Sequence, residues 1–510
     1  MFETDARDLR IDEYENAAVG EFTHLQIDSG LWPVYNAGAF ELITRCKLSP
    51  IVESQDEVVT KPVRKSLGRR AIIAGGSLGG MLAARAVAPH FVEVVVLERD
   101  VFTDSPAPRR TTPQSHHVHM LLKGGENAID RILPGFRGAI EDGGSVTIRA
   151  GLDFLAGSEL GFAPRWDAGM ELHGQSRWML EHCIRQRVLT STPLVELRTG
   201  CTVRALKFDA PSNRITGVKV ESQGGTSDLD ADLVIDATGR GEGGLRWLSA
   251  LGVPLPEVEE VTVDFGYSSA IVELPDDPAR DWKALAMGNL PRVGARGAVL
   301  LPIEGGRFIC SLGGRAGDYP PDNEAEFLEF AKSLPHPTMY EALRGARFVS
   351  SVARMIYPAN RFRHYERSQT LPHGLIPLGD ALCSFNPTYG QGMTSAALQA
   401  EALFDTLAGR TPQDSLDDLT RAYLVRAAEA ARMPWRQANY NDFLYPTTQG
   451  NREMFTPEET QYRMEIQIAA ARDAELRKLS NEVGHLLVPF ERLMEPDVRA
   501  RVANALAQNA

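Results

Sequence analysis

The sequence predicts an α/β fold, in which a Rossmann-like domain is interrupted by an inserted β-sheet domain and followed by a helical C-terminal region. Three observations support this prediction. A strand–helix–strand pattern begins near residue 70, strand-like stretches dominate from about residue 256, and helix-start signals recur after residue 411. Glycine-containing motifs near residues 75, 236 and 380 also indicate that the insertion splits the Rossmann-like part in two.

The first motif lies in the strand–helix–strand unit. The turn Gly75-Gly76-Ser77-Leu78-Gly79-Gly80 joins the apolar strand AIIA to a helix, where backbone N–H groups can bind a pyrophosphate. Glu98 ends the next apolar strand, where a carboxylate can accept hydrogen bonds from an adenosine ribose. This acid favours FAD or NAD over NADP. Arg99 is either a further contact of the site or a solvated residue.

The middle of the chain reads as two groups of strands. Residues 201–237 carry a β meander with turns at residues 211–213 and at Gly224-Gly225, and they end in the apolar strand ADLVIDATG. Residues 256–365 contain further strand candidates and a helix around 323–333. We expect the second group to form a separate sheet-rich lobe.

The third motif begins where the strand Leu375–Leu378 ends in Gly379-Asp380. It continues through Asn386-Pro387-Thr388-Tyr389-Gly390-Gln391-Gly392-Met393 into a helix predicted for residues 391–407, with Gly409 as its C-cap. Asp380 can hold ribityl or ribose hydroxyls, and the helix N-terminus can stabilise the negative charge of a reduced flavin. The alternative is an aspartate N-cap followed by a structural glycine turn.

Composition excludes several classes of protein. The 510 residues are 43% hydrophobic and carry a formal net charge of −13, so a nucleic-acid partner is not expected. Five scattered cysteines, without a CxxC pair, favour a reduced cytoplasmic location. The N-terminus lacks the pattern of a signal peptide, and no apolar run reaches the roughly 20 residues of a transmembrane helix.

In their order and spacing, these motifs resemble the para-hydroxybenzoate hydroxylase-like flavoprotein monooxygenases over about residues 70–410. Two stretches also look like the bacterial branch that contains the polyether epoxidases, whose FAD carries an oxygen to polyene alkenes. One is PRRTTPQSHHVH at residues 108–119, and the other combines DLVIDATGRGEGGLRWLSALG at 232–252 with SFNPTYGQGM at 384–393.

The resemblance implies FAD-binding roles for particular residues. Those predicted to bind the cofactor are Gly75, Gly76, Ser77, Gly79 and Gly80 at the pyrophosphate, Glu98 and Arg99 near the ribose, Arg177 at a helix start, Val203 beside the adenine, and Asp380, Pro387, Gly390, Gln391, Gly392 and Met393 near the ribityl chain and flavin. No catalytic residue is assigned. The family's usual Gly-Asp-Ala-Ala-His reads Gly379-Asp380-Ala381-Leu382-Cys383 here, and Cys383 is interpreted as a buried thiol.

The sequence does not decide the roles of two clusters of residues, one of histidines and one of arginines. His116, His117 and His119 lack a third ligand at metal spacing, so no metal is predicted and a loop near the isoalloxazine is the preferred interpretation. Arg109 and Arg110 either contact a phosphate or a transient NAD(P)H, or form a solvated basic turn.

The resemblance implies the following domains: an N-terminal extension at 1–67, an FAD-binding domain at 68–255 and 371–410, a substrate-binding β-sheet domain at 256–370, and a helical C-terminal region at 411–510. The implied activity is insertion of one oxygen atom from O2 into a small apolar organic substrate, by epoxidation or hydroxylation through a flavin C4a-hydroperoxide. NADH, NADPH or a separate flavin reductase would supply the electrons.

The sequence also bears on three other functions. Halogenation is disfavoured because none of the six tryptophans falls in a WxWxIP motif. An FAD-dependent reductase of the geranylgeranyl reductase type stays open, because it differs mainly in its substrate lobe and electron donor. A non-catalytic flavin-binding protein is a further alternative, and oxygen uptake would distinguish it. The oligomeric state is not predicted.

Overall fold

The computed structural model describes residues 66–289, 291 and 293–507. The extension predicted for residues 1–67 therefore lies, up to residue 65, outside the described residues. The α/β fold with a parallel sheet and a helical C-terminal region is confirmed.

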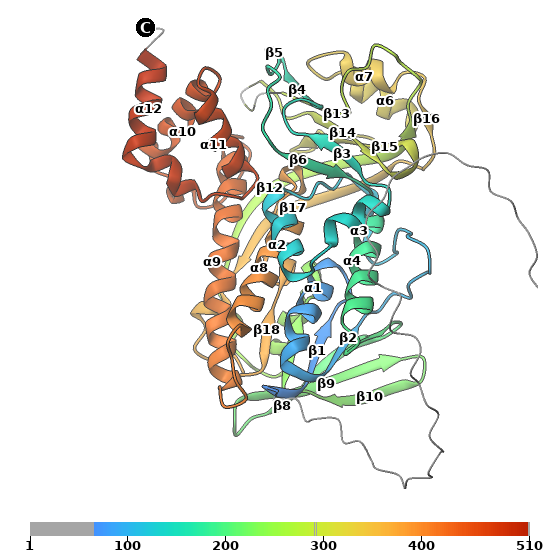
Figure 1. Ribbon diagram of the computed structural model, residues 1–510, viewed down its shortest axis with the longest axis vertical. Helices are drawn as coiled ribbons and strands as arrows, with labels where there is room; N and C mark the ends of the chain where they lie inside the picture. Colours follow the sequence, from blue (N-terminus) through green and yellow to red (C-terminus); the bar gives the residue numbers. More distant parts are fainter. Residues whose placement is uncertain (1–65, 290, 292, 508–510) are drawn as a thin grey trace, which may run out of the picture. The chain divides into compact units, whose positions relative to one another are not determined.

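A five-stranded parallel sheet forms the centre of the Rossmann-like part (Figure 1). Its strand order is β18 (Leu375–Pro377), β11 (Leu233–Asp236), β1 (Gly68–Ala74), β2 (Phe91–Leu97) and β7 (Val195–Arg198). The apolar runs predicted as strands are buried along most of their length, as strands covered on both faces require. Ala74 pairs with Asp236 and Asp236 with Pro377, so three distant motifs end at one edge.

Helices from both segments of the Rossmann-like part pack around the central sheet. Helix α1 packs against α8 and α4, and α2 also packs against α8. The helix predicted for residues 391–407 is confirmed, with Gln391 as its N-cap and Gly409, at φ +75°, just past its end. The helices of this part are α1 (Leu78–Val87), α2 (Lys123–Ile132), α3 (Phe136–Asp142), α4 (Arg177–Ser191), α5 (Gly243–Ala250) and α8 (Gly392–Leu407).

The predicted meander is confirmed as a three-stranded antiparallel sheet in the order β10-β9-β8. Its strands are β8 (Thr202–Asp209), β9 (Arg214–Ser222) and β10 (Gly225–Asp230). The chain then enters the central sheet directly as β11. The second motif, which follows the meander, therefore lies at the edge of the central sheet where β1 ends.

The sheet-rich lobe is built around a nine-stranded sheet in the order β19-β17-β12-β15-β14-β13-β4-β5, with β16 paired to β12. Its strands are β4 (Phe154–Ser158), β5 (Gly161–Phe162), β12 (Val258–Glu273), β13 (Ala284–Gly288), β14 (Gly297–Ile303), β15 (Arg307–Arg315), β16 (Arg347–Phe348), β17 (Ala353–Arg363) and β19 (Cys383–Ser384). Because β4, β5 and β19 come from outside residues 256–370, the large sheet draws on several segments of the chain. Separately, β3 (Val146–Arg149) pairs with β6 (Glu171–Gly174).

The remaining helices cover the large sheet or form the C-terminal region. They are α6 (Glu324–Lys332), α7 (Thr338–Leu343), α9 (Leu416–Phe443), α10 (Pro457–Ala470), α11 (Ala474–Gly484) and α12 (Pro496–Ala507). Helix-start signals were expected after residue 411, and the structure has two of them: Ser415 caps α9, and Thr456, followed by a proline at N1, caps α10. Figure 1 shows α10–α12 grouped at the C-terminal end of the chain.

A buried ionic network ties the long helix α9 to the large sheet. Asp442, fully buried on α9, binds the Arg315 guanidinium at 2.6 Å and accepts hydrogen bonds from Tyr389 and Asn386, both at 2.8 Å. Asn360 donates to the second carboxylate oxygen at 2.8 Å. The side chain of Arg315 is 3% exposed. Removing either partner of such a pair leaves an uncompensated buried charge.

We expect Asp442→Ala to lower the free energy of unfolding by about 3–5 kcal/mol, the usual cost of breaking a buried ion pair on one side. The matched control is Asp281→Ala, because Asp281 is 74% exposed where it pairs with Arg165. That change should cost less than about 1 kcal/mol. Chemical denaturation of both variants measures the difference, and similar costs at the two positions would contradict the role given to the network.

Candidate functional site

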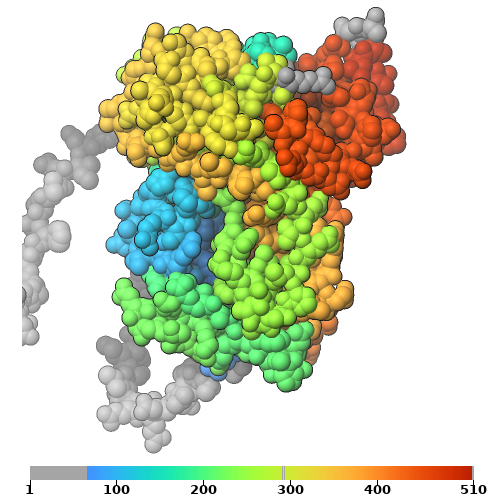
Figure 2. Space-filling view, turned by 180° about the vertical axis from the view of Figure 1, so that it is seen from behind, coloured from blue at the N-terminus to red at the C-terminus, as the bar shows by residue number. Residues whose placement is uncertain are grey.

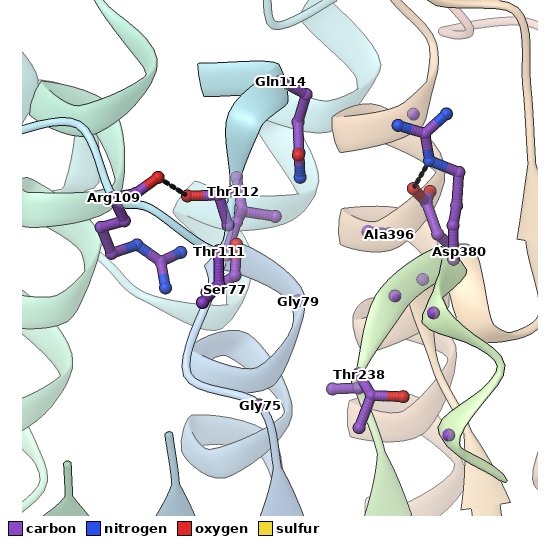
Figure 3. Close-up of a pocket in the computed structure, with 18 of the residues that line it drawn as sticks. Gly75, Ser77, Gly79, Arg109, Thr111, Thr112, Gln114, Thr238, Asp380 and Ala396 are labelled. Carbon is purple, nitrogen blue, oxygen red and sulfur yellow. Dashed lines mark hydrogen bonds and ion pairs between the residues drawn. The ribbon is translucent and has the colours of Figure 1, made fainter. Parts of the chain in front are cut away.

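A cavity of about 490 Å³ opens where strands β1, β11 and β18 end. Figure 2 shows its opening as a hollow between the blue surface of residues near 110 and the green surface of segments after residue 200. In Figure 3, Gly75, Ser77 and Gly79 lie on one side of the cavity and Asp380 lies opposite them. All three motifs singled out in the sequence therefore contribute to one cavity.

The turn that opens α1 depends on glycine at two positions. Gly75 has φ +112°, and a Cβ atom there would overlap the carbonyl oxygen of Ala237. A Cβ atom on Gly80 would overlap the carbonyl oxygen of Gly75, so Gly80 allows helix and strand to pack closely. Ser77 is the N-cap of α1 and gives its helix no side-chain cap. The first N–H groups of α1 are thus left for a ligand.

Glu98 is buried beside this turn, at 5% exposure. Its carboxylate accepts hydrogen bonds from the N–H groups of Gly76 at 2.7 Å and Asp100 at 2.9 Å, and Arg109 lies 3.4 Å away. A carboxylate has about four acceptor positions, so capacity remains for a hydroxyl group of a ligand. Glu98 lines the cavity, as its place at the end of β2 predicts.

A buried carboxylate missed by the sequence analysis, Glu181, orients two arginines at the same place. It binds Arg109 at 2.6 Å and Arg177 at 2.7 Å, and it also accepts a hydrogen bond from the Ser77 hydroxyl. Burial alone would raise the pKa of Glu181, but the two guanidinium groups lower it to about 2. Glu181 therefore stays charged and fixes Arg109 and Arg177 beside the N-terminus of α1.

For Arg109, this geometry excludes one of the two interpretations left open by the sequence. Arg109, with its side chain 10% exposed, lines the cavity and is ion-paired, so a solvated turn is the wrong interpretation for this residue. Arg110 is exposed and does not line the same cavity. The i,i+4 spacing of Arg177 and Glu181 was a signal for their pairing, whereas nothing in the sequence connects Arg109 with Glu181.

The opposite wall carries a second helix start. Asp380 has 35% of its side chain exposed, and its nearest cation is Arg240, with Nε 3.7 Å from the carboxylate. Burial raises the pKa of Asp380, and Arg240, Arg177 and Arg363 oppose that shift. Helix α8 begins at Gly392 without a side-chain cap, and a Cβ atom on Gly392 would meet only Asp380, at 3.9 Å. The start of α8 is therefore open towards the cavity.

Most of the predicted cofactor-binding residues line this cavity: Gly75, Ser77, Gly79, Glu98, Arg99, Arg177, Val203, Asp380, Pro387, Gly390, Gly392 and Met393. Gly76, Gly80 and Gln391 do not line it. The N–H of Gly76 donates to Glu98, which does line the cavity. Gly80 packs against Gly75, and Gln391 is buried at 2% exposure. Lining residues to which the sequence assigned no individual role include Thr111, Thr112, Gln114, Thr238, Arg240, Tyr267 and Met355.

A second cavity of about 340 Å³ adjoins the first and lies against the large sheet. The two cavities share four lining residues, which are His117, Val118, Tyr267 and Pro387. The walls of the second cavity are rich in apolar and aromatic side chains, among them Phe265, Met287, Val299, Leu312, Tyr389 and Tyr445. The two cavities thus meet at the histidine-containing loop.

Two of the three histidines in that loop face the cavities. His117 lines both, His119 lines the first, and His116 is exposed. Burial lowers the pKa of His117 to about 3 and that of His119 to about 4, so both rings are neutral at neutral pH. Among the described residues, no group of three or more His, Cys, Asp and Glu side chains is arranged to hold a metal ion.

The described helices include none with the length and hydropathy to cross a membrane. Cys383 is buried at 1% exposure and free, and burial raises the pKa of its thiol well above its usual value.

Solved structures similar to this chain are FAD-dependent monooxygenases and related flavoproteins. The flavin-dependent brominase Bmp2 is 16% identical with a TM-score of 0.59 and covers 86% of this chain and 98% of its own. The p-nitrophenol 4-monooxygenase PnpA from Pseudomonas putida is 18% identical, with a TM-score of 0.58, over 82% and 99% of the two chains. A flavoprotein/dehydrogenase from Cytophaga hutchinsonii is 12% identical, with a TM-score of 0.61, over 86% and 100%. The fold is that of the FAD-dependent monooxygenases.

A closer relative defines the family. Protein Rv3254 of Mycobacterium tuberculosis is 31% identical over 350 residues, which are 67% of this chain and 73% of that protein. The chain belongs to the family of this mycobacterial protein. No protein-family model matches the chain.

The glycines of the site lead to a direct prediction. Gly80→Ala should lower the free energy of unfolding by about 3 kcal/mol or more, because the added methyl group overlaps a backbone carbonyl that cannot move away. Gly392→Ala serves as the matched control, since its Cβ atom has room, and it should change stability by no more than about 1 kcal/mol. Chemical denaturation of both proteins measures this, and equal stabilities would show that the close packing at Gly80 is misplaced.

Proposed function

We propose that this protein is an FAD-dependent monooxygenase that inserts one oxygen atom from O2 into an apolar organic substrate, by epoxidation or hydroxylation. One observation carries the proposal: two uncapped helix starts and an aspartate line a cavity that adjoins a second, apolar cavity. The first cavity has the chemistry of a dinucleotide site, and the second has that of a substrate site.

The residues around the first cavity fit FAD at both ends. The free N–H groups of α1, together with Arg109 and Arg177, would hold the pyrophosphate, since an anion is stabilised at a helix N-terminus and by fixed guanidinium groups. Glu98 would accept hydrogen bonds from the adenosine ribose, and Val203 would lie beside the adenine. Gly75, with no Cβ atom, allows close approach of the phosphates.

The flavin end of the cofactor would lie near Asp380 and the start of α8. Asp380 would accept hydrogen bonds from the ribityl hydroxyls, because its carboxylate faces the cavity. The partial positive charge at the start of α8 would stabilise a negative charge on the reduced ring. Gly390, at φ +64°, and Gly392 keep that wall free of side chains.

The residues around the second cavity would bind the substrate and exclude water. When bound and reduced, FAD supplies the electrons that activate O2. The apolar side chains of Phe265, Met287 and Leu312 would shield the substrate from water and would suit an alkene, whose oxidation requires no base. The polyether epoxidases, whose FAD carries an oxygen to alkenes, are the parallel for this chemistry.

The electron donor would be NADH, NADPH or a separate flavin reductase. A reductase of the geranylgeranyl type is the alternative with the same cofactor site. The two functions differ in their use of oxygen, because the reductase consumes no O2 when it reduces its substrate. Oxygen consumption coupled to product formation therefore distinguishes them.

We expect the purified protein to carry one noncovalent FAD per chain, and we expect Asp380→Ala to weaken FAD binding by about tenfold or more. A hydrogen bond to a charged group contributes roughly 1.5–3 kcal/mol, and only the carboxylate can accept bonds from the ribityl chain. Fluorescence titration of the apoprotein with FAD gives the dissociation constants.

The matched control for this prediction is Cys383→Ala, which removes a buried thiol on β19 close to Asp380 in sequence. FAD affinity should be unchanged in this variant. Equal loss of FAD from both variants would contradict the role of Asp380, and release of FMN or of no flavin from the wild-type protein would contradict the cofactor proposal.

A further inference from the structure

A third cavity, of about 170 Å³, adjoins the first, and the side chains of Arg109 and Thr112 line both. The segment that follows β2 and one face of helix α4 form most of its walls, and we call it the Arg185 pocket after a lining residue of α4. The first cavity has about 490 Å³, so the Arg185 pocket is much the smaller of the two. It has room for a group the size of a phosphate, but not for a whole dinucleotide.

Arg185 is a buried cation without a carboxylate partner. It is 7% exposed, and its guanidinium packs over the ring of Phe102, with Cζ 4.0 Å from the ring centroid. One of its N–H groups donates to Nδ1 of His182 at 3.2 Å, and within the described part of the chain it forms no ion pair. Burial lowers the pKa of Arg185, and the charge of Glu181 opposes this shift without cancelling it. A guanidinium has five N–H donors, so most of them remain available to a ligand.

The two carboxylates that line the Arg185 pocket are already engaged. Asp100 accepts a hydrogen bond from the Thr111 hydroxyl and lies 3.4 Å from Arg109. Glu181 binds Arg109 at 2.6 Å. Arg110 also lines the pocket, is exposed, and has no ion pair with any described residue. The pocket therefore has cations left over after its own carboxylates are paired.

Ser115 is a second polar group of the pocket that lacks a partner. It is 3% exposed and lines the Arg185 pocket, and its Oγ has no hydrogen-bond partner among the residues that the structure describes. A buried hydroxyl without a partner lowers the stability of the folded protein, and a ligand that accepts its hydrogen bond removes this cost. A ligand for this pocket must therefore accept hydrogen bonds from a guanidinium and from a hydroxyl.

We propose that the Arg185 pocket binds a phosphate-type oxyanion, and that Arg185 and Ser115 donate hydrogen bonds to its oxygens. A planar guanidinium matches the geometry of two phosphate oxygens, and a hydrogen bond between charged groups is stronger than one between neutral groups. The anion is either free inorganic phosphate or the phosphate group of a nucleotide, such as the 2′-phosphate that distinguishes NADPH from NADH. The site rests on the geometry of the pocket, and only the nucleotide source rests on the proposed function, which requires an electron donor.

Isothermal titration calorimetry of the FAD-loaded protein, with inorganic phosphate and with 2′-AMP as the probes, tests this site. We expect binding of at least one probe, and we expect Arg185→Met to weaken it by about tenfold or more, because a hydrogen bond between charged groups is lost. The matched control is Arg187→Met, since Arg187 lies on the same helix, donates to the carbonyl oxygen of Pro134 and lines none of the three cavities. Its affinity should equal that of the wild-type protein.

Ser115→Ala separates the binding role from a role in folding. Because the hydroxyl has no partner in the folded protein, its removal should leave the free energy of unfolding unchanged or raise it, as measured by chemical denaturation without phosphate. The same variant should bind the probe about threefold or more weakly, because one hydrogen bond to the anion is lost. A destabilised Ser115→Ala protein with wild-type affinity would contradict the role of this hydroxyl, and this test holds even if Arg185→Met does not fold.

Comparison of the probes identifies the source of the phosphate. Tighter binding of 2′-AMP, with a KM for NADPH that rises in Arg185→Met while the KM for NADH does not, supports the nucleotide. Tighter binding of inorganic phosphate supports the free anion. Binding of neither probe, or equal affinities of the wild-type protein and Arg185→Met, overturns the inference. The titrations require no turnover, so a protein that binds phosphate in this way but consumes no O2 refutes the proposed function and leaves the site standing.

Discussion

The parallel pairing of β1, β11 and β18 is the constraint on which the site depends. Ala74 lies opposite Asp236, and Asp236 opposite Pro377, so three segments separated by well over a hundred residues end at the same edge. Asp236, 3% exposed, accepts hydrogen bonds from the N–H of Thr238 at 3.0 Å and from its hydroxyl at 2.7 Å. This carboxylate fixes the turn after β11 and thereby the wall of the first cavity.

The charged side chains around the first cavity lie beside groups of opposite charge. Glu181 holds Arg109 and Arg177 on one side, and Arg240 lies near Asp380 on the other. A fixed guanidinium group can bind an anion without first losing side-chain entropy, so Glu181 gives Arg109 and Arg177 the arrangement that the proposed phosphate contact requires. The chain has a formal net charge of −13, and the positive character of the site is therefore local.

The parts of the site that depend on neighbouring residues were predictable from the sequence. The glycine turn at residues 75–80, the acid at the end of β2 and the helix after Gly390 each depend on one strand–turn–helix segment, and the structure contains all three segments. Solved structures with the same fold confirm the fold class. The roles of the individual residues remain predictions that the FAD measurements address.

Other features depend on contacts between distant segments, which a single sequence does not reveal. The partner of Arg109 is Glu181, 72 residues away, and Ser269 meets Ser311 only through the register of β12 and β15. The strand β4 joins the large sheet by pairing in parallel with β13, far along the chain. In the same way, the stretch PRRTTPQSHHVH could be picked out by its resemblance to other flavoproteins, but its place at the boundary between two cavities is visible only in three dimensions.

The proposed function requires that a flavin at this sheet edge activates O2 beside the second cavity. Rapid mixing of the anaerobically reduced protein with O2, followed by absorbance spectroscopy, tests it most directly. We expect a transient spectrum that differs from those of both reduced and oxidised flavin, and incorporation of one ¹⁸O atom into product when ¹⁸O2 is used with a substrate. Direct conversion of the reduced to the oxidised spectrum, with no ¹⁸O in any product, would contradict it.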